Sequence, residues 1–411
     1  MVSAPSVRLP LESESFETAR GICRVLGRAG FEAWIVGGSV RDLVMGVSPH
    51  DWDIATSATP DKVISLFPRT IAVGVQFGVV IVRMHGLDFE VATFRADTGY
   101  SDGRRPDSVR FTDLREDVLR RDFTLNGLAL DPETGAVVDL VGGIQDIADR
   151  LIRAIGDPEM RFQEDRLRPL RAIRFAAVTG FMIEPLTFEA IRRNAPFITQ
   201  VSVERIAAEY SKMLTARDPS TGYRLAAASG LLAATIPELD PGDPTTPLVL
   251  DRLKGSAGDL MWAAMLHRVG PAGAADTLRR LKMPGRDCTA VSSIIQTALD
   301  LRTIRIDDVA AHKRILRRQS TPDALRLLRA WLEASGSTRT PAETADELLA
   351  RYDTAALNPP ALINGNDVLA AGIPNGPGIA AILKQVEDAQ LRGSIGTREE
   401  ALEMLARARG N

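Results

Sequence analysis

The strongest constraint on the fold of this chain is a change in residue pattern near Arg161. Before that point, short apolar runs that end in glycine alternate with segments of helical periodicity, as expected of strands and helices that share one core. From Arg161 onward the strand pattern nearly vanishes, and Ala, Leu, Arg and Glu recur at helical spacing between prolines. We therefore predict an α+β fold, in which a small mixed-sheet head precedes an almost entirely helical neck, body and tail.

The elements expected in the first part follow from its local patterns. Apolar residues at helical spacing predict a helix over 16–29, which Gly30 ends. Two β-rich runs separated by His85 and Gly86 predict a hairpin. The other expected elements are a strand over 33–36 that runs into Gly37 and Gly38, a helix over 40–45, a strand over 53–55 and a helix over 57–67 with Thr59 as N-cap and Pro60 at its first position.

Composition limits the classes of protein to which the chain can belong. It has 411 residues and no apolar run of about 18 residues, and the segment after Met1 has no apolar core, so we expect neither a membrane span nor secretion. Cys23 and Cys288 lie far apart and cannot make a zinc site or a disulfide framework, which favours a reducing cytoplasm. The 53 acidic and 50 basic residues nearly cancel, so composition alone gives no support for a nucleic-acid partner.

A pair of acidic residues stands at the start of the expected 53–55 strand. Asp51 and Asp53 flank Trp52, and alternation along a strand places residues two apart on the same face. Like charges held together favour a cation between them, and hard carboxylate oxygens suit Mg²⁺. The pair therefore predicts a metal site, although solvated turns and strand ends also produce this pattern.

Neighbouring residues strengthen the chemical interpretation of that pair. Gly37 and Gly38, between a strand and a helix, let backbone N–H groups approach a phosphate, and Arg41 follows one turn later. Phosphate binding beside a metal-binding pair is what nucleotidyl transfer requires. Glu90 interrupts the β-rich run 87–94 and is the natural third carboxylate; the alternative is a solvent-facing residue of an edge strand.

In these motifs the sequence resembles the class II tRNA nucleotidyltransferases, the family that includes the CCA-adding enzymes and bacterial poly(A) polymerases. The segments 37–42 and 51–56 resemble the family's first motif with its usual spacing. Four further segments, 120–127, 139–143, 164–175 and 204–212, resemble the second to fifth motifs in the family's order. The resemblance implies a nucleotidyltransferase head over 1–143, a helical neck with a base-recognition motif over 144–215, a helical body over 216–300 and a helical tail over 301–411 that anchors tRNA.

The resemblance also implies roles for individual residues. It implies a transferase that takes CTP and ATP as substrates, acts on the 3′ end of tRNA and uses Mg²⁺ as cofactor. The expected catalytic residues are Asp51, Asp53 and Glu90, of which Asp51 and Asp53 are also the expected metal ligands. The expected nucleotide-binding residues are Gly37, Gly38, Arg41 and Arg121 for the triphosphate, Asp122 and Asn126 for the ribose, Asp165 and Arg168 for the base, together with Arg171 and Arg174.

The base-recognition segment invites a geometric expectation. Asp165 and Arg168 are three apart on a predicted helix, so an acceptor and a donor would face one base edge together. Arg171 lies closer to this face than Arg174, and for both the alternative is a structural ion pair. Pro169 departs from the family pattern. Inside a helix it would remove a backbone hydrogen bond and re-aim Arg168, whereas in a first turn it would cost little.

Two further features bear on RNA. The polar stretch 96–110 predicts a mobile loop, and in the family a loop here is needed to add the terminal A, which argues against a CC-only enzyme. Basic residues concentrated in the C-terminal half suit contacts with a phosphate backbone, with a solvated helix face as the alternative. They are Arg302, Arg305, Lys313, Arg314, Arg317, Arg318, Arg326 and Arg329, with a smaller group of Arg279, Arg280, Lys282 and Arg286.

Several functions fit these motifs. We favour addition of CCA to tRNA, with an A-adding enzyme as runner-up and a poly(A) polymerase next. A non-catalytic RNA-binding protein on the same scaffold is the alternative from another class, but it would not need to crowd Asp51, Asp53 and Glu90 around a phosphate path. A metal phosphohydrolase built on His50 and Asp51 is disfavoured, because the other histidines are scattered without ligand spacing.

Overall fold

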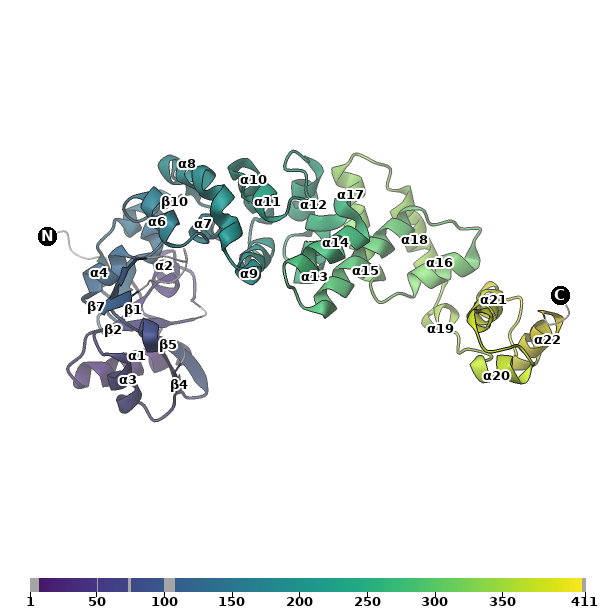
Figure 1. Ribbon diagram of the computed structural model, residues 1–411, viewed down its shortest axis with the longest axis horizontal. Coiled ribbons are helices and arrows are strands. Elements are labelled where there is room, and N and C mark those ends of the chain that lie inside the picture. Colours follow the sequence, from purple (N-terminus) through teal and green to yellow (C-terminus); the bar gives the residue numbers. More distant parts are fainter. Residues whose placement is uncertain (1–6, 50, 73–74, 100–107, 409–411) are drawn as a thin grey trace. The chain divides into compact units, whose positions relative to one another are not determined.

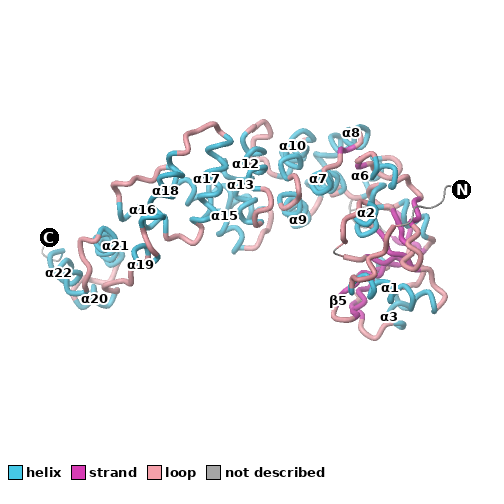
Figure 2. The backbone as a smooth tube through the Cα atoms, turned by 180° about the vertical axis from the view of Figure 1, so that it is seen from behind, coloured by secondary structure: helices cyan, strands magenta, loops and turns pink. Residues whose placement is uncertain are grey.

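The computed structural model describes residues 7–49, 51–72, 75–99 and 108–408 (Figure 1). Contacts between residues divide the chain into two compact units, Met1–Gly242 and Asp243–Asn411. All the described strands lie in the first unit, and the described part of the second unit is helical (Figure 2). The predicted α+β class is therefore confirmed, while the boundaries placed at residues 143, 215 and 300 stay predictions.

A seven-stranded mixed sheet is the scaffold of the first unit, with the strand order β3-β4-β5-β2-β1-β8-β9. β2 and β5 run parallel, and the other neighbouring strands are antiparallel. The expected strands and the hairpin through His85 and Gly86 are confirmed, and both turn residues have positive φ. The bounds are β1 Ala33–Val36, β2 Asp53–Thr56, β3 Thr70–Ile71, β4 Val79–Met84, β5 Leu87–Thr93, β8 Leu128–Leu130 and β9 Val137–Asp139.

Helices cover the sheet and continue beyond it. α1 begins after Ser13, whose hydroxyl accepts a hydrogen bond from Phe16 N, and it buries Phe16, Ile22 and Leu26 against the sheet. α3 begins at Pro60 with Thr59 as its N-cap residue, as expected, and also packs on the sheet. The helices of this unit are α1 Glu14–Arg28, α2 Gly38–Val44, α3 Pro60–Leu66, α4 Leu114–Leu119, α5 Gly143–Ala148, α6 Pro158–Glu164, α7 Arg168–Thr179, α8 Pro185–Asn194, α9 Val203–Leu214, α10 Pro219–Ser229 and α11 Leu231–Thr235.

Two short sheets lie where the sequence did not predict strands. β6 Arg95–Thr98 and β7 Ser108–Phe111 pair antiparallel, so both ends of the expected 96–110 loop are strands, and residues 100–107 lie outside the described residues. A ladder needs only backbone hydrogen bonds, which is why polar residues can form it. β10 Leu151–Ile152 and β11 Met182–Ile183 pair parallel, and β11 interrupts a stretch expected to be helical.

The second unit is built from helices that bury apolar faces against one another. α13 is the most enclosed of them, with every residue from Leu260 to Leu266 buried. The last helices, α20 to α22, surround a small core of their own that includes Val368, Val386 and Ala401. The bounds are α12 Thr245–Leu253, α13 Gly258–Leu266, α14 Gly270–Arg280, α15 Gly285–Arg302, α16 Val309–Leu316, α17 Thr321–Ala334, α18 Thr340–Arg351, α19 Thr354–Leu357, α20 Gly365–Ala370, α21 Pro377–Arg392 and α22 Arg398–Ala408. Among the helices that the structure describes, none is both long and apolar enough to cross a membrane.

Candidate active site

A cleft of about 520 Å³ in the first unit brings together most of the residues expected from the sequence. It lies where β1, β2 and β5 of the sheet meet the start of α7. Twelve of the thirteen expected site residues line it, and Asp51 does not. The lining residues are Val36, Gly37, Gly38, Arg41, Asp53, Ile54, Glu90, Ala92, Arg120, Arg121, Asp122, Asn126, Asp165, Arg168, Arg171, Arg174 and Phe175.

The turn after β1 forms one wall of the cleft. Gly37 has φ +79° and ψ −136°, a conformation that only glycine adopts without strain. A Cβ atom on Gly37 would lie 3.5 Å from Nη1 of Arg121 and 3.7 Å from Oδ2 of Asp53. A Cβ on Gly38 would lie 3.6 Å from Nη2 of Arg41. The two glycines therefore keep the chain close to the charged groups of the cleft without filling the space in front of them.

Two carboxylates face the cleft from neighbouring parallel strands. Ile54 pairs with Val91, so Asp53 and Glu90, each one residue earlier, lie side by side. The surrounding protein atoms and the negative charges of Glu90 and then Asp51 raise the pKa of Asp53 to about 6, although Arg121 opposes this. The side chain itself remains open to solvent. The negative charges of Asp53 and Glu90 thus repel each other locally, a repulsion that a divalent cation would relieve, and their oxygen atoms fit such a cation.

That Asp51 and Asp53 point to one face stays a prediction, since only Asp53 belongs to β2, although the charge of Asp51 acts on Asp53. β2 begins at Asp53, so the alternation of a strand does not reach Asp51, which is exposed. Within the described ranges, no three His, Cys, Asp or Glu side chains are grouped closely enough to hold a metal ion. The arrangement therefore fits a cation held by few protein ligands, with its remaining positions left for substrate or water.

A continuous chain of hydrogen bonds runs through the cleft. Nη1 of Arg41 donates to Oδ1 of Asn126 at 2.9 Å, and Nδ2 of Asn126 donates to Oδ1 of Asp122 at 3.1 Å. Asp122 Oδ1 also accepts from Phe123 N, and Oδ2 accepts from Nε and Nη2 of Arg171 at 2.9 and 2.7 Å. A carboxylate oxygen accepts about two hydrogen bonds, so a ribose hydroxyl would have to displace one of these donors from Asp122.

These hydrogen bonds, together with nearby positive charges, lower the pKa of Asp122. Burial alone would raise its pKa, but the charges of Arg171 and Arg168 and the hydrogen bonds from Asn126 and Arg171 lower it to about 2. The ordinary value is 3.8, so the ionised side chain stabilises the folded state above that pH, and this contribution is lost as pH falls toward 2.

We expect the Asp122→Asn variant to lose about 2 kcal/mol in free energy of unfolding at pH 7 relative to the parent protein. The difference should shrink as the pH falls below 4, because the parent carboxylate then also takes up its proton. Urea unfolding of both proteins at pH 7 and pH 3 measures it. An equal difference at both pH values would contradict the conclusion that the ionised Asp122 stabilises the folded state.

The base-recognition segment departs from the predicted helix. α6 ends at Glu164, Asp165 is extended with φ −133°, and α7 begins only at Arg168. Pro169 therefore lies in the first turn of α7, where it removes no helical hydrogen bond. The predicted pairing of Asp165 and Arg168 on one helix was wrong, because no helix contains both: α6 ends before Asp165 and α7 begins at Arg168.

Each of these two side chains is held by a different partner. Asp165 accepts from Nη2 of Arg205 at 2.9 Å and from Leu167 N at 3.0 Å. Arg168 donates to Oε2 of Glu164 at 2.7 Å and to the carbonyl oxygen of Arg120 at 2.9 Å. Both side chains nevertheless line the cleft, so an acceptor and a donor still face the same space.

Phe175 is one of five lining residues that were not expected site residues; the others are Val36, Ile54, Ala92 and Arg120. The ring of Phe175 lies 3.7 Å from the guanidinium carbon of Arg174, and those of Arg41 and Arg171 lie 5.4 and 5.5 Å from it. Arg174 also donates to Glu209 at 2.7 Å, so both Arg171 and Arg174 have the structural ion pairs considered as alternatives. A large apolar residue among closely spaced arginines was the available signal for Phe175.

The basic residues of the second unit are largely paired with acids. The pairs are Arg305 with Asp307, Arg314 with Glu387 and Asp388, Arg317 with Glu387, Arg318 with Asp300, Arg326 with Asp323 and Arg329 with Asp346. Arg302 lies over the ring of Trp331, and Lys313 donates to the carbonyl oxygen of Leu391 at 2.9 Å. Arg305 with Asp307 and Arg326 with Asp323 are local pairs, whereas the other contacts connect different helices of the unit or the segments next to them, which fits a structural role for many of these residues.

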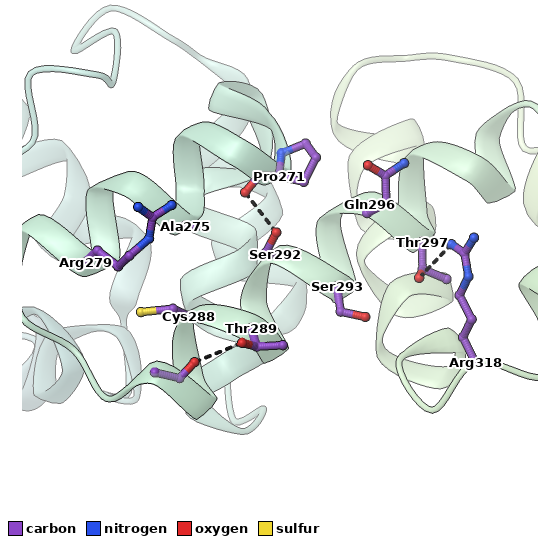
Figure 3. A pocket seen from close by; sticks show the side chains of 11 residues that line it. Pro271, Ala275, Arg279, Cys288, Thr289, Ser292, Ser293, Gln296, Thr297 and Arg318 are labelled. Carbon is purple, nitrogen blue, oxygen red and sulfur yellow. Dashed lines mark hydrogen bonds between the residues drawn. The ribbon is translucent and has the colours of Figure 1, made fainter. Parts of the chain in front are cut away.

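A cavity of about 580 Å³ in the second unit offers different chemistry (Figure 3). It lies along α14 and α15, and hydroxyl groups such as Ser292 and Thr289 line it together with Arg279 and Arg318. None of its lining residues is an Asp or Glu. It therefore lacks the carboxylates that a metal-dependent transfer needs, and the cleft of the first unit is the better candidate.

Family models match the chain from its head to its tail. Residues 33–153 match the model of the poly(A) polymerase head domain. Residues 180–242 match a model of an RNA-binding segment of polymerase A, and residues 254–406 match a model of a second domain of tRNA nucleotidyltransferases.

Whole-chain relatives agree with these matches. The CCA-adding enzyme of Levilactobacillus brevis is 35% identical over 95% of this chain and 97% of its own length. That of a Geobacillus species is 35% identical over 95% of this chain and 96% of its own. The crystal structure of the Bacillus stearothermophilus CCA-adding enzyme in complex with CTP matches with a TM-score of 0.79 and 31% identity, over 97% of this chain and 98% of that one. Enzymes of this family generally use a divalent metal ion. The chain therefore belongs to the class II CCA-adding enzyme family and is a nucleotidyltransferase.

Proposed function

We propose that this protein adds CMP and AMP to the 3′ ends of tRNA, taking CTP and ATP as substrates, to complete the CCA terminus. The observation that carries the proposal is the cleft, in which two adjacent carboxylates, Asp53 and Glu90, share one space with Arg41, Arg121 and the base-facing residues of α7. An anion site next to carboxylates is the arrangement that nucleotidyl transfer requires. The whole-chain likeness to CCA-adding enzymes supports the choice of RNA.

The chain's own residues divide the work of binding and transfer. Gly37 and Gly38 leave room for the triphosphate, which Arg41 and Arg121 hold as charge-assisted donors. Asn126, fixed by Asp122 and Arg41, lies where it can meet the ribose. These contacts hold the nucleotide so that the 3′-hydroxyl of the RNA attacks the α-phosphate in line and pyrophosphate leaves.

The carboxylates prepare that attack. Asp51 and Asp53 would hold Mg²⁺, which when bound stabilises charge on the triphosphate and activates the attacking hydroxyl. Glu90 lies beside Asp53 and orients the 3′-hydroxyl or accepts its proton. The negative charge of Glu90 adds to the effect of burial in raising the pKa of Asp53, and a bound cation would offset this repulsion.

We assign base selection to the part of the cleft that Asp165 and Arg168 line. Asp165 and Arg168 offer an acceptor and a donor fork, held by Arg205 and Glu164 respectively. In this proposal Pro169 is no obstacle to reading both C and A, because it lies in the first turn of α7. The relative from Bacillus stearothermophilus was solved in complex with CTP, which supports CTP as a substrate of this protein. We also propose that the protein works in the cytoplasm, where its free cysteines, Cys23 and Cys288, would stay reduced.

The test is incorporation by the purified protein with Mg²⁺ on three tRNA transcripts, which end before, within and after the CC sequence. Each receives CTP alone, ATP alone or both. Completion of CCA on the shortest transcript is the expected result. Addition of a single A only to the CC-ended transcript would identify an A-adding enzyme instead, and long A tracts a poly(A) polymerase. Absence of incorporation from all three would refute the proposal and favour an RNA-binding protein without catalysis.

A further inference from the structure

Asp117 is a buried carboxylate outside the cleft that binds two arginines of the second motif. It lies in α4, and its side chain is 1% exposed. Its Oδ1 accepts from Nε and Nη2 of Arg120 at 3.0 and 2.6 Å, and its Oδ2 accepts from Nε and Nη2 of Arg121 at 3.3 and 3.0 Å. Arg95 N donates to Oδ1 at 3.3 Å. A buried carboxylate with this many donors fixes the side chains around it.

The two hydrogen bonds to Arg121 determine which part of its guanidinium faces the cleft. They engage Nε and Nη2, and the remaining nitrogen, Nη1, lies 3.5 Å from the place where a Cβ of Gly37 would be. The same Gly37 position is 3.7 Å from Oδ2 of Asp53. Asp117 thus binds Nε and Nη2 of Arg121, and this leaves Nη1 directed at the turn formed by Gly37 and Gly38.

Arg120 extends the contact toward the neck. Asp117 fixes its side chain, and its backbone carbonyl oxygen accepts the 2.9 Å hydrogen bond from Nη2 of Arg168. The residue that binds Asp117 on one side therefore supports a base-facing arginine on the other. One carboxylate is connected in this way to both ends of the nucleotide cleft.

We propose that Asp117 is a positioning residue for nucleotide binding, which aims Arg121 at the triphosphate and keeps Arg120 in place behind Arg168. This inference depends on the proposed function, since it takes Arg121 as a triphosphate ligand. Burial alone would raise the pKa of Asp117, but the charges of Arg120 and Arg121 and their hydrogen bonds outweigh it and lower the pKa. The carboxylate is therefore ionised throughout the neutral range, as a permanent anchor for arginine must be.

A purely structural ion pair would affect folding alone, so the test separates nucleotide binding from stability. In Asp117→Asn the KM for CTP should rise about tenfold, because the charge-assisted bonds that aim Arg121 are lost, while kcat at saturating CTP and the KM for tRNA change less than about twofold. Thermal unfolding of the same samples reports the folded fraction. If Asp117→Asn does not fold, Asp117→Glu keeps the charge but displaces it, and the KM for CTP should again rise severalfold in a folded protein.

A double-mutant cycle tests whether Asp117 affects the KM for CTP through Arg121. In an Arg121→Ala background, Asp117→Asn should raise the KM for CTP by no more than about twofold further, because the arginine that it positions is already gone. Full additivity of the two changes would overturn the proposal. So would an unchanged KM for CTP in folded Asp117→Asn or Asp117→Glu protein.

Asp113→Ala is the matched control. Asp113 caps the same helix by accepting a hydrogen bond from Glu116 N at 3.0 Å, and it has no hydrogen bond with Arg121 in the described structure. Its loss should destabilise α4 and leave the KM for CTP unchanged; a raised KM would mean that any weakening of α4 suffices and would overturn the proposal. If the parent protein incorporates no nucleotide at all, the proposed function fails. If it does and the folded Asp117 variants bind CTP normally, only the present inference fails.

Discussion

Replacing Asp53 by alanine is expected to lower nucleotide incorporation by about three orders of magnitude while tRNA binding stays within about twofold of the parent protein. Asp53 is the first residue of β2 and shares the cleft with Glu90, so its loss removes a carboxylate that would hold the metal ion in the proposed reaction. The raised pKa of Asp53 means that its charge opposes folding above about pH 6, so the variant should melt no lower than the parent at pH 7. Single-turnover incorporation, filter binding of tRNA and thermal unfolding measure the three quantities.

Asp88→Ala provides the control on the same strand. Asp88 lies two residues before Glu90 in β5, is exposed, and pairs with Arg83 across the hairpin at 2.6 Å. Its loss should leave incorporation within about twofold of the parent, since exposed ion pairs contribute little. The assignment of Asp53 fails if Asp53→Ala keeps substantial activity, or if it is inactive only because it no longer folds.

Replacing Gly143 by alanine is expected to destabilise the first unit by about 3 kcal/mol, because the added methyl has no space. Its Cβ would collide with the carbonyl oxygen of Thr124 and would lie 2.9 Å from the carbonyl carbon. The backbone cannot yield easily there, because Asp139 accepts hydrogen bonds from successive amides, including those of Gly142, Gly143 and Ile144 at 2.8 to 3.0 Å. The melting temperature should fall by roughly 10 °C, measured by calorimetry.

Gly142→Ala separates this collision from ordinary glycine strain. Gly142 has φ +79° and nothing within 4 Å of its Cβ position, so alanine there should cost only about 1 to 2 kcal/mol. Equal losses at both positions would show that conformation rather than close packing dominates. Gly143→Ala should also weaken CTP binding, because Thr124 begins the short 3₁₀ turn that ends at Asn126 in the cleft.

The sequence predicted the cleft because its motifs follow local rules that the fold keeps. The strand before Gly37 and Gly38 and the strand that begins at Asp53 are adjacent in the sheet, so residues at their ends meet whatever the rest of the chain does. Glu90 was found because an acid in an apolar strand is conspicuous, and parallel pairing with β2 then places it next to Asp53. Gly37, Gly38, Asp53 and Glu90 stood out by local pattern, whereas the expected roles of Arg121, Asp122 and Asn126 came only from the resemblance to the family.

What the sequence could not predict depends on long-range partners. Helical periodicity runs through Asp165, but α6 ends at Glu164 and Asp165 is extended, and it accepts a hydrogen bond from Arg205, 40 residues away. Asp117 belongs to none of the motifs in the sequence, and only the fold shows that it is buried and paired with two arginines. Backbone pairing likewise made strands of residues 95–98 and 108–111, whose polarity had suggested a loop.

The pairing of the basic residues in the second unit has a consequence for how RNA binding would respond to salt. Six of the eight basic residues counted there already contact a carboxylate. A phosphate that reaches one of these residues must displace its carboxylate. The freed carboxylate then binds a cation from solution, so fewer cations are released in total when the RNA binds. The slope of log affinity against log salt concentration would then be shallower than eight unpaired cations would give, and shape rather than charge would carry more of the contact.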